Sequence, residues 1–225
     1  MISRLVCALL YVTATNAVAS ESMKPLPPDA RVAGKSASEW SAAWWQWAFA
    51  QPDGLRAYQD PTGAACTQGQ QGAVWFLAGT SGSDAVKRRC AVPKGKYLFF
   101  PVINMVNFSP RGAHLPCAEV RAGAAANNDH LQHAIVKLDG VVVPDVAHFR
   151  ARTEKCFDVF ARATYVEDSS AYTPAASDGY WLMIEPPSPG HHHLSVRANY
   201  ANPHTAYGEM IQYFDYDIDV VDPAI

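Results

Sequence analysis

Apolar and polar residues alternate in short runs along most of the chain after residue 72, and Gly, Pro and Asp separate the runs. This period of two is typical of strands that have one face in a core. Within one run, Asp139-Gly140 predicts a hairpin turn. We therefore expect strands over residues 73–78, 86–91, 96–103, 133–143, 157–165, 179–185, 191–200 and 210–221.

Helical patterns occur in two segments. Ser36 and Glu39 have the spacing of a capping box, so we expect a helix from there to about Gln51, before the turn Pro52-Asp53-Gly54. An Ala-rich stretch predicts a second, short helix over residues 117–132.

The first helix carries large aromatic side chains on two sides. At about 100° per residue, Trp40, Trp44 and Trp47 share one face, and Trp45 and Phe49 point almost the opposite way. Exposed Trp side chains are frequent anchors at binding surfaces, so Trp40, Trp44 and Trp47 are candidate ligand-binding residues for sugars or hydrophobic ligands. The alternative is that these rings pack in the core between the helix and a sheet.

Together the patterns predict a mainly β protein. We expect a β-sandwich or jelly roll of antiparallel sheets, with the Trp-rich N-terminal helix and the second short helix packed on it. The run 179–185 is apolar on both faces, which indicates that a helix covers the outer face of the sheet there. No internal repeat or interdomain linker occurs, so residues 20–225 are expected to form a single domain.

Residues 1–19 have the features of an export signal. Arg4 supplies a positive charge, residues 5–12 are apolar, and Ala17-Val18-Ala19 has the small-x-small form that signal peptidases cut. The apolar run is shorter than the roughly 20 residues that span a bilayer. We therefore expect a cleaved signal peptide and a soluble periplasmic or secreted protein with no integral membrane segment.

The cysteines agree with an oxidising compartment. Cys66, Cys90, Cys117 and Cys156 remain after cleavage, and four cysteines allow three pairings. We expect Cys66–Cys90 and Cys117–Cys156, because each pair then brackets a local structural unit. A zinc site made of the four thiolates is the alternative, but no C-x2-C spacing occurs.

Charge gives no argument for an anionic partner. The chain has 18 Lys and Arg and 21 Asp and Glu, and cleavage removes Arg4, so the net charge goes from −3 to −4. This balance does not favour nucleic acid or an anionic membrane as a partner.

Ionisable residues gather on the last two expected strands. If these strands pair as a hairpin around residue 205, His193 lies near Asp217 and His191 lies near Asp219 on one face. Two imidazoles beside two carboxylates can bind a divalent metal ion or act as an acid–base pair. The alternative is a solvated sheet face with weak cross-strand charge pairs.

A second candidate metal site depends on the second helix. If that helix is continuous, His130 and His133 lie on neighbouring rows and Glu119 could complete the ligands. However, the segment lies where helix should give way to strand. A histidine favoured by the dipole at a helix end explains His130 equally well.

Residues 34–105 contain several motifs that occur together: Glu39-Trp40-Ser41, Trp44-Trp45-Gln46-Trp47, Cys66 with Gly69-Gln70, residues 74–80, Cys90 to Lys96, Leu98-Phe99-Phe100-Pro101 and Asn104. Together they resemble an uncharacterised family of exported bacterial proteins with a Trp-rich WWQW helix and paired cysteines. The resemblance implies export, paired cysteines and a shared fold, and it assigns no activity, cofactor or functional residue.

The sequence favours a binding protein of the bacterial envelope or extracellular space, whose ligand is a glycan, an envelope component or another protein. One alternative is a metal-dependent enzyme that acts on an extracellular polymer. Another is a structural envelope protein with no small-molecule site. No G-x-S-x-G elbow, phosphate-binding glycine loop or dinucleotide fingerprint occurs.

Overall fold

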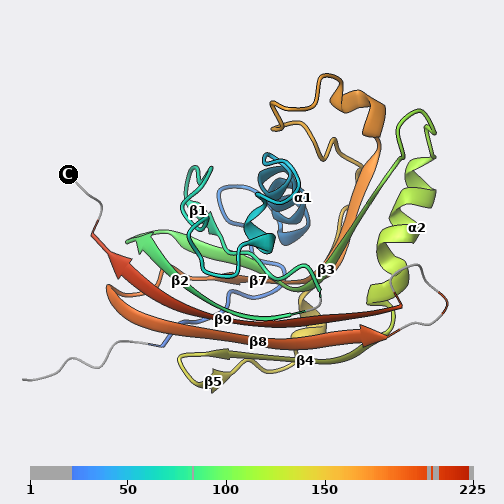
Figure 1. Ribbon diagram of the computed structural model, residues 1–225. Helices are drawn as coiled ribbons and strands as arrows, with labels where there is room; N and C mark the ends of the chain where they lie inside the picture. Colours follow the sequence, from blue (N-terminus) through green and yellow to red (C-terminus); the bar gives the residue numbers. More distant parts are fainter. Residues whose placement is uncertain (1–21, 83, 202–203, 205–207, 223–225) are drawn as a thin grey trace, which may run out of the picture.

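A computed structural model describes residues 22–82, 84–201, 204 and 208–222, and the predicted signal peptide lies outside them. The described part is mainly β, as predicted: strands form two sheets stacked like a sandwich, and two α-helices pack against the first sheet (Figure 1). None of its helices is long and apolar enough to cross a membrane.

The first sheet has four strands in the order β1-β3-β7-β6, and the second has five in the order β2-β9-β8-β4-β5. The first sheet consists of β1 (Val74–Phe76), β3 (Tyr97–Phe108), β7 (Ala175–Ile184) and β6 (Arg150–Arg152). The second consists of β2 (Ala85–Pro93), β9 (Glu209–Val221), β8 (Gly190–Ala201), β4 (Leu131–Leu138) and β5 (Val141–Val142). The α-helices are α1 (Ala37–Ala48) and α2 (Cys117–Asn128), and short 3-10 helices cover Ala57–Gln59, Val146–Phe149 and Ser169–Tyr172.

Both sheets are mixed, whereas the sequence predicts antiparallel sheets throughout. β1 runs parallel to β3, and β2 runs parallel to β9. β2 and β3 are consecutive in the chain, but they lie in different sheets instead of forming a hairpin. Alternation shows which side of a strand is buried and does not show which strand lies beside it, so these parallel pairs have no local signal.

Two predicted elements differ from the structure. No strand forms over residues 157–165, because the Asp158 carboxylate accepts a hydrogen bond from the Phe160 amide at 2.8 Å and turns the chain. The second helix ends at Asn128, and β4 begins at Leu131. His133 therefore lies on a strand, and the helical site of Glu119, His130 and His133 does not form.

The core has two main layers. One lies between the two sheets, and the other lies between the first sheet and α1. Every residue of β7 is buried, so the strand predicted over 179–185 is covered on both faces up to Ile184, and Glu185 is exposed. α1 starts at the predicted capping box, in which Ser36 and Glu39 exchange hydrogen bonds, and its indole rings enter the second layer.

Asp139 joins three separate segments at the turn between β4 and β5. Its carboxylate accepts hydrogen bonds from the backbone N–H groups of Met23 (2.9 Å) and His193 (2.8 Å), and lies 2.9 Å from Nδ1 of buried His192. Burial alone would raise the pKa of Asp139, but the hydrogen bonds from His192, His193 and Met23 outweigh it and hold that pKa below its ordinary value.

We expect Asp139→Asn to lower the free energy of unfolding at neutral pH by about 2 kcal/mol, since hydrogen bonds to a charged group contribute about 1.5–3 kcal/mol. A carboxyl whose pKa is lowered in the folded state stabilises above its unfolded pKa of about 4, and this contribution disappears as pH falls through the folded pKa. Urea unfolding from pH 7 down to about 3 should therefore show the two proteins converging at the acid end. Asp145→Asn is the matched control, because exposed Asp145 has nearly the same backbone φ, 49° against 50°. A constant difference between Asp139→Asn and the wild type at every pH would contradict the expectation.

Candidate functional site

A cavity of about 530 Å³ lies where α1, the end of β3 and two connecting segments meet. α1 contributes Trp44 and Trp45, its C-cap residue Phe49 also lines the cavity, and β3 contributes Phe108. The segment 160–172 forms another side with Phe160 and Tyr172. Volumes of about 300–1,000 Å³ with mainly aromatic walls are usual for small-molecule sites.

The aromatic side chains of one wall contact one another. The Phe49 ring centroid lies 5.7 Å from that of Trp45, 6.0 Å from that of Phe108 and 5.2 Å from that of Phe160. Phe160 in turn lies 4.9 Å from Tyr172. Most of these contacts have the edge-to-face geometry that stabilises aromatic pairs, so the wall is a packed surface instead of a set of independent side chains.

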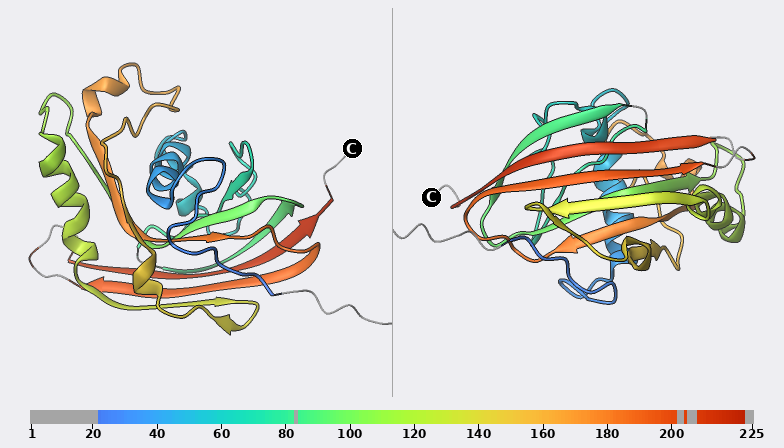
Figure 2. Two further views of the ribbon diagram at one scale, coloured as in Figure 1. Left: turned by 180° about the vertical axis from the view of Figure 1, so that it is seen from behind. Right: turned by 90° about the horizontal axis from the view of Figure 1, so that it is seen from below.

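The course of β3 opens the space for the cavity. The pairing of β3 with β7 shifts register between Pro101 and Ile103, and both strands continue beyond this bulge along α2, which lies on the side opposite α1 (Figure 1; Figure 2, left). Gly179 of β7 faces Asn104 here, and a Cβ at this position would lie 2.6 Å from the Cα of Asn104. The glycine therefore lets β7 pack closely behind Asn104, which lines the cavity.

Hydrogen bonds hold another part of the lining, residues 79–81. The buried Gln212 side chain of β9 accepts from the Thr80 amide at 2.7 Å and donates to the Thr80 carbonyl at 3.1 Å. The Gln212 side-chain amide thus bonds the Thr80 backbone as the backbone of a neighbouring strand would. Both its oxygen and its nitrogen have a hydrogen-bond partner within the protein.

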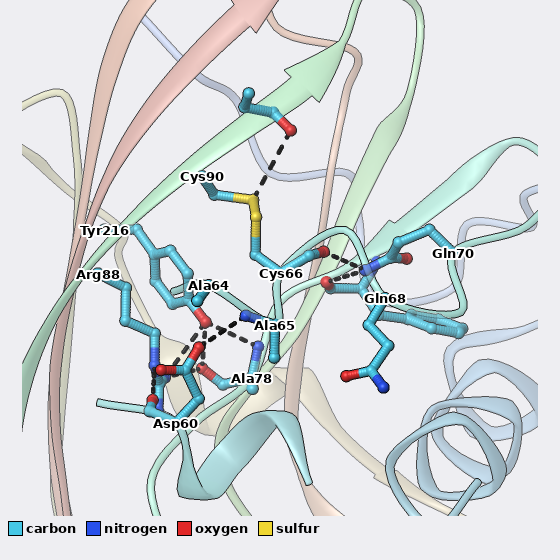
Figure 3. Close-up of a disulfide and its surroundings, with 12 residues drawn as sticks. Asp60, Ala64, Ala65, Cys66, Gln68, Gln70, Ala78, Arg88, Cys90 and Tyr216 are labelled. Carbon is cyan, nitrogen blue, oxygen red and sulfur yellow. Dashed lines mark hydrogen bonds between the residues drawn. A yellow bond between two sulfur atoms is a disulfide. The ribbon is translucent and has the colours of Figure 1, made fainter. Parts of the chain in front are cut away.

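Arg88 supports the same loop from behind and is 1% exposed. Its guanidinium donates to the carbonyl oxygens of Ala78 and Gly79 (both 2.8 Å) and Asp60 (2.7 Å), and to the Tyr216 hydroxyl (3.2 Å). Figure 3 shows this group beside the disulfide that ties the 60–66 segment to β2. Burial raises the pKa of the Tyr216 hydroxyl, so Tyr216 is neutral beside the cation.

One cationic group lines the cavity near its exposed side. Arg56 lies over the Phe49 ring, with 4.2 Å between the guanidinium carbon and the ring centroid. The Arg56 guanidinium also bonds the Tyr58 hydroxyl at 3.0 Å and the exposed Asp53 carboxylate at 3.2 Å. Tyr165, 41% exposed, donates its hydroxyl proton to the Phe49 carbonyl and links the 160–172 segment to the end of α1.

The predicted histidine–aspartate pairs lie on the face of the second sheet that points away from the core, and none of their residues lines the cavity. The predicted register is confirmed: His191 Nδ1 lies 3.0 Å from Asp219, and His193 Nδ1 lies 3.1 Å from Asp217. Lys87 also contacts Asp217, at 3.2 Å. Over the residues described, no group of three or more His, Cys, Asp or Glu side chains is arranged to hold a metal ion. Metal binding here stays a prediction, which elemental mass spectrometry of the purified protein tests.

The predicted tryptophans do not form an exposed row. Trp44 and Trp47 are buried, and their indole N–H groups donate to the carbonyls of Leu77 (2.9 Å) and Gln68 (2.7 Å). Half-buried Trp40 donates to the Val32 carbonyl at 3.1 Å. Of the three, the structure brings only Trp44 into the cavity lining described above.

Both disulfides form as predicted, Cys66–Cys90 and Cys117–Cys156. The sequence reasoning missed Asn104, Arg56 and the 160–172 segment as parts of one site. The second aromatic side of the helix was the available signal, since Trp45 and Phe49 line the cavity together with Trp44. Comparisons with protein-family models, curated proteins and solved structures give no match for this chain.

Proposed function

We propose that this protein is an exported binding protein that holds a small, mainly apolar molecule in the aromatic cavity. The observation that carries the proposal is the cavity of about 530 Å³ with walls of packed aromatic side chains. Burial of a ligand's apolar surface against such walls provides the driving force, at about 25 cal/mol per Å².

The export part rests on the signal predicted over residues 1–19 and on the two disulfides, which persist in oxidising compartments. Among the ligands predicted from sequence, an apolar component of the envelope or its surroundings fits better than a glycan. Glycan sites use open aromatic platforms, but here the aromatic side chains pack against one another in the wall of a concave cavity, and Trp44 and Trp47 are buried.

The test is titration of the mature, disulfide-bonded protein with phenylnaphthylamine, whose fluorescence rises in apolar surroundings. We expect saturable binding of one molecule, with a dissociation constant of about 1–10 μM, which corresponds to about 7–8 kcal/mol. Val106→Trp places a large side chain in the cavity lining and should weaken binding at least tenfold.

Val142→Trp is the matched control, since Val142 is 55% exposed on β5, far from the cavity lining. Near-ultraviolet circular dichroism verifies that both variants keep native packing. Failure of the wild type to bind, or equal binding by Val106→Trp and the wild type, would overturn the proposal.

A further inference from the structure

Two hydrogen-bond donors in the cavity wall have no partner. The Trp45 indole N–H and the Asn104 side-chain amide are buried without a hydrogen-bond partner in the part of the chain that the structure describes. Trp45 is 8% exposed and Asn104 is 7% exposed, and both line the cavity. Buried donors in native proteins are nearly always paired, so two unpaired donors around one cavity call for an acceptor from outside the chain.

Neighbouring polar groups of the same region are satisfied by the protein. Gln212 pairs both ends of its amide with Thr80, and the Trp44 indole donates to the Leu77 carbonyl. The fold therefore provides acceptors for similar groups a few residues away. The Trp75 and Trp181 indole N–H groups are also buried without a partner, but neither lines the cavity. Of the unpaired donors in the described residues, those of Trp45 and Asn104 are the two that line it.

We propose that the ligand carries a neutral oxygen acceptor, such as a ketone, ester or amide carbonyl, that receives hydrogen bonds from Trp45 and Asn104. This inference rests on the proposed function, because it names the chemical class that the same cavity selects. A carbonyl oxygen has two acceptor positions and can therefore accept both N–H groups.

A neutral acceptor fits these donors better than a carboxylate. Both donors are uncharged, and a carboxylate buried beside them would lack a counter-ion. The cation of the lining, Arg56, already bonds the Asp53 carboxylate, the Tyr58 hydroxyl and the Gln51 carbonyl. The site therefore suits a ligand that has an apolar body and an uncharged oxygen at one end.

The experiment compares two ligands of the same shape in competition with phenylnaphthylamine. Methyl naphthyl ketone carries a carbonyl oxygen, and isopropenylnaphthalene carries a methylene group in its place. Trp45→Phe removes the indole N–H, and Asn104→Leu removes the amide at similar volume. We expect each variant to weaken binding of the ketone roughly tenfold and to change binding of the alkene by less than about twofold.

Met105→Leu is the control, because it changes an apolar side chain of the lining and should move both affinities together. If both ligands bind and neither Trp45→Phe nor Asn104→Leu changes their affinity ratio, the inference fails while the proposed function stands. Binding of naphthoate more tightly than the ketone, with loss in Arg56→Leu, would also overturn it in favour of an anionic ligand. If none of these compounds nor phenylnaphthylamine binds the wild type, the proposed function itself fails.

Discussion

Replacing Arg88 with leucine should lower the free energy of unfolding by about 3–5 kcal/mol, because this buried guanidinium makes several hydrogen bonds and a hydrogen bond to a charged group contributes about 1.5–3 kcal/mol. The guanidinium is the shared donor for the carbonyl oxygens of Asp60, Ala78 and Gly79 and for the Tyr216 hydroxyl. Leucine leaves the Asp60 and Gly79 carbonyls without their donor, whereas the Ala78 carbonyl and the Tyr216 hydroxyl stay hydrogen-bonded to each other. Each unsatisfied buried acceptor costs about 1–3 kcal/mol unless water enters. Urea unfolding followed by tryptophan fluorescence measures the loss.

Arg89→Leu is the matched control for this variant. Arg89 is the next residue of β2 and is exposed, so the same substitution there should stay within about 0.5 kcal/mol of the wild type. Arg88→Lys should recover only part of the stability, because an ammonium group cannot place donors in the planar fork that reaches the separate carbonyls. Equal stability of Arg88→Leu and Arg89→Leu would contradict this account of the loop support.

Replacing Trp44 with alanine should also lower the free energy of unfolding by about 3–5 kcal/mol, as for other buried Trp→Ala substitutions. The Trp44 side chain is 1% exposed, and its ring lies within 4.9 Å of Trp45 and 5.4 Å of Trp181 between ring centroids. Its loss leaves a space between α1 and β7 and removes the hydrogen bond to the Leu77 carbonyl. Because Trp44 also lines the cavity, phenylnaphthylamine should bind this variant more weakly.

Trp40→Ala provides the comparison from the same helix. Trp40 is half-buried, and its ring contacts Phe76 at 6.0 Å and the Lys35 ammonium at 4.9 Å. We expect a smaller loss, about 1–2 kcal/mol, and unchanged binding of the probe. Equal losses of stability for Trp40→Ala and Trp44→Ala in urea unfolding would contradict the view that the deeper burial of Trp44 causes the larger loss.

Several features of this fold could be predicted because they depend on neighbours in sequence. The capping box of Ser36 and Glu39 starts α1, and Asp139-Gly140 forms the turn between β4 and β5. The register of β8 and β9 follows from alternation and a hairpin connection, which is why His191 meets Asp219 and His193 meets Asp217.

The sequence also shows the aromatic residues of the Trp-rich helix, but it does not show which of them line a cavity. Trp45 and Phe49 carry the same kind of side chain as Trp40 and Trp47, yet only the packing of β3 and the 160–172 segment turns one side of α1 into a cavity wall. The strand predicted over 157–165 illustrates the reason. Its alternation suits a sheet, but the Asp158 turn and the burial of both Val159 and Phe160 make it a covering segment instead.

The sequence by itself determined most of the local elements and the β-rich class, because capping, alternation and turn chemistry act over a few residues, and it favoured the cysteine pairs that form. Only the tertiary structure decided that β2 runs parallel to β9, and that Trp45 and Asn104 meet at one cavity from segments about 60 residues apart in the chain. Whether a buried donor is paired depends on every group within hydrogen-bond distance, and most of those groups are distant in sequence.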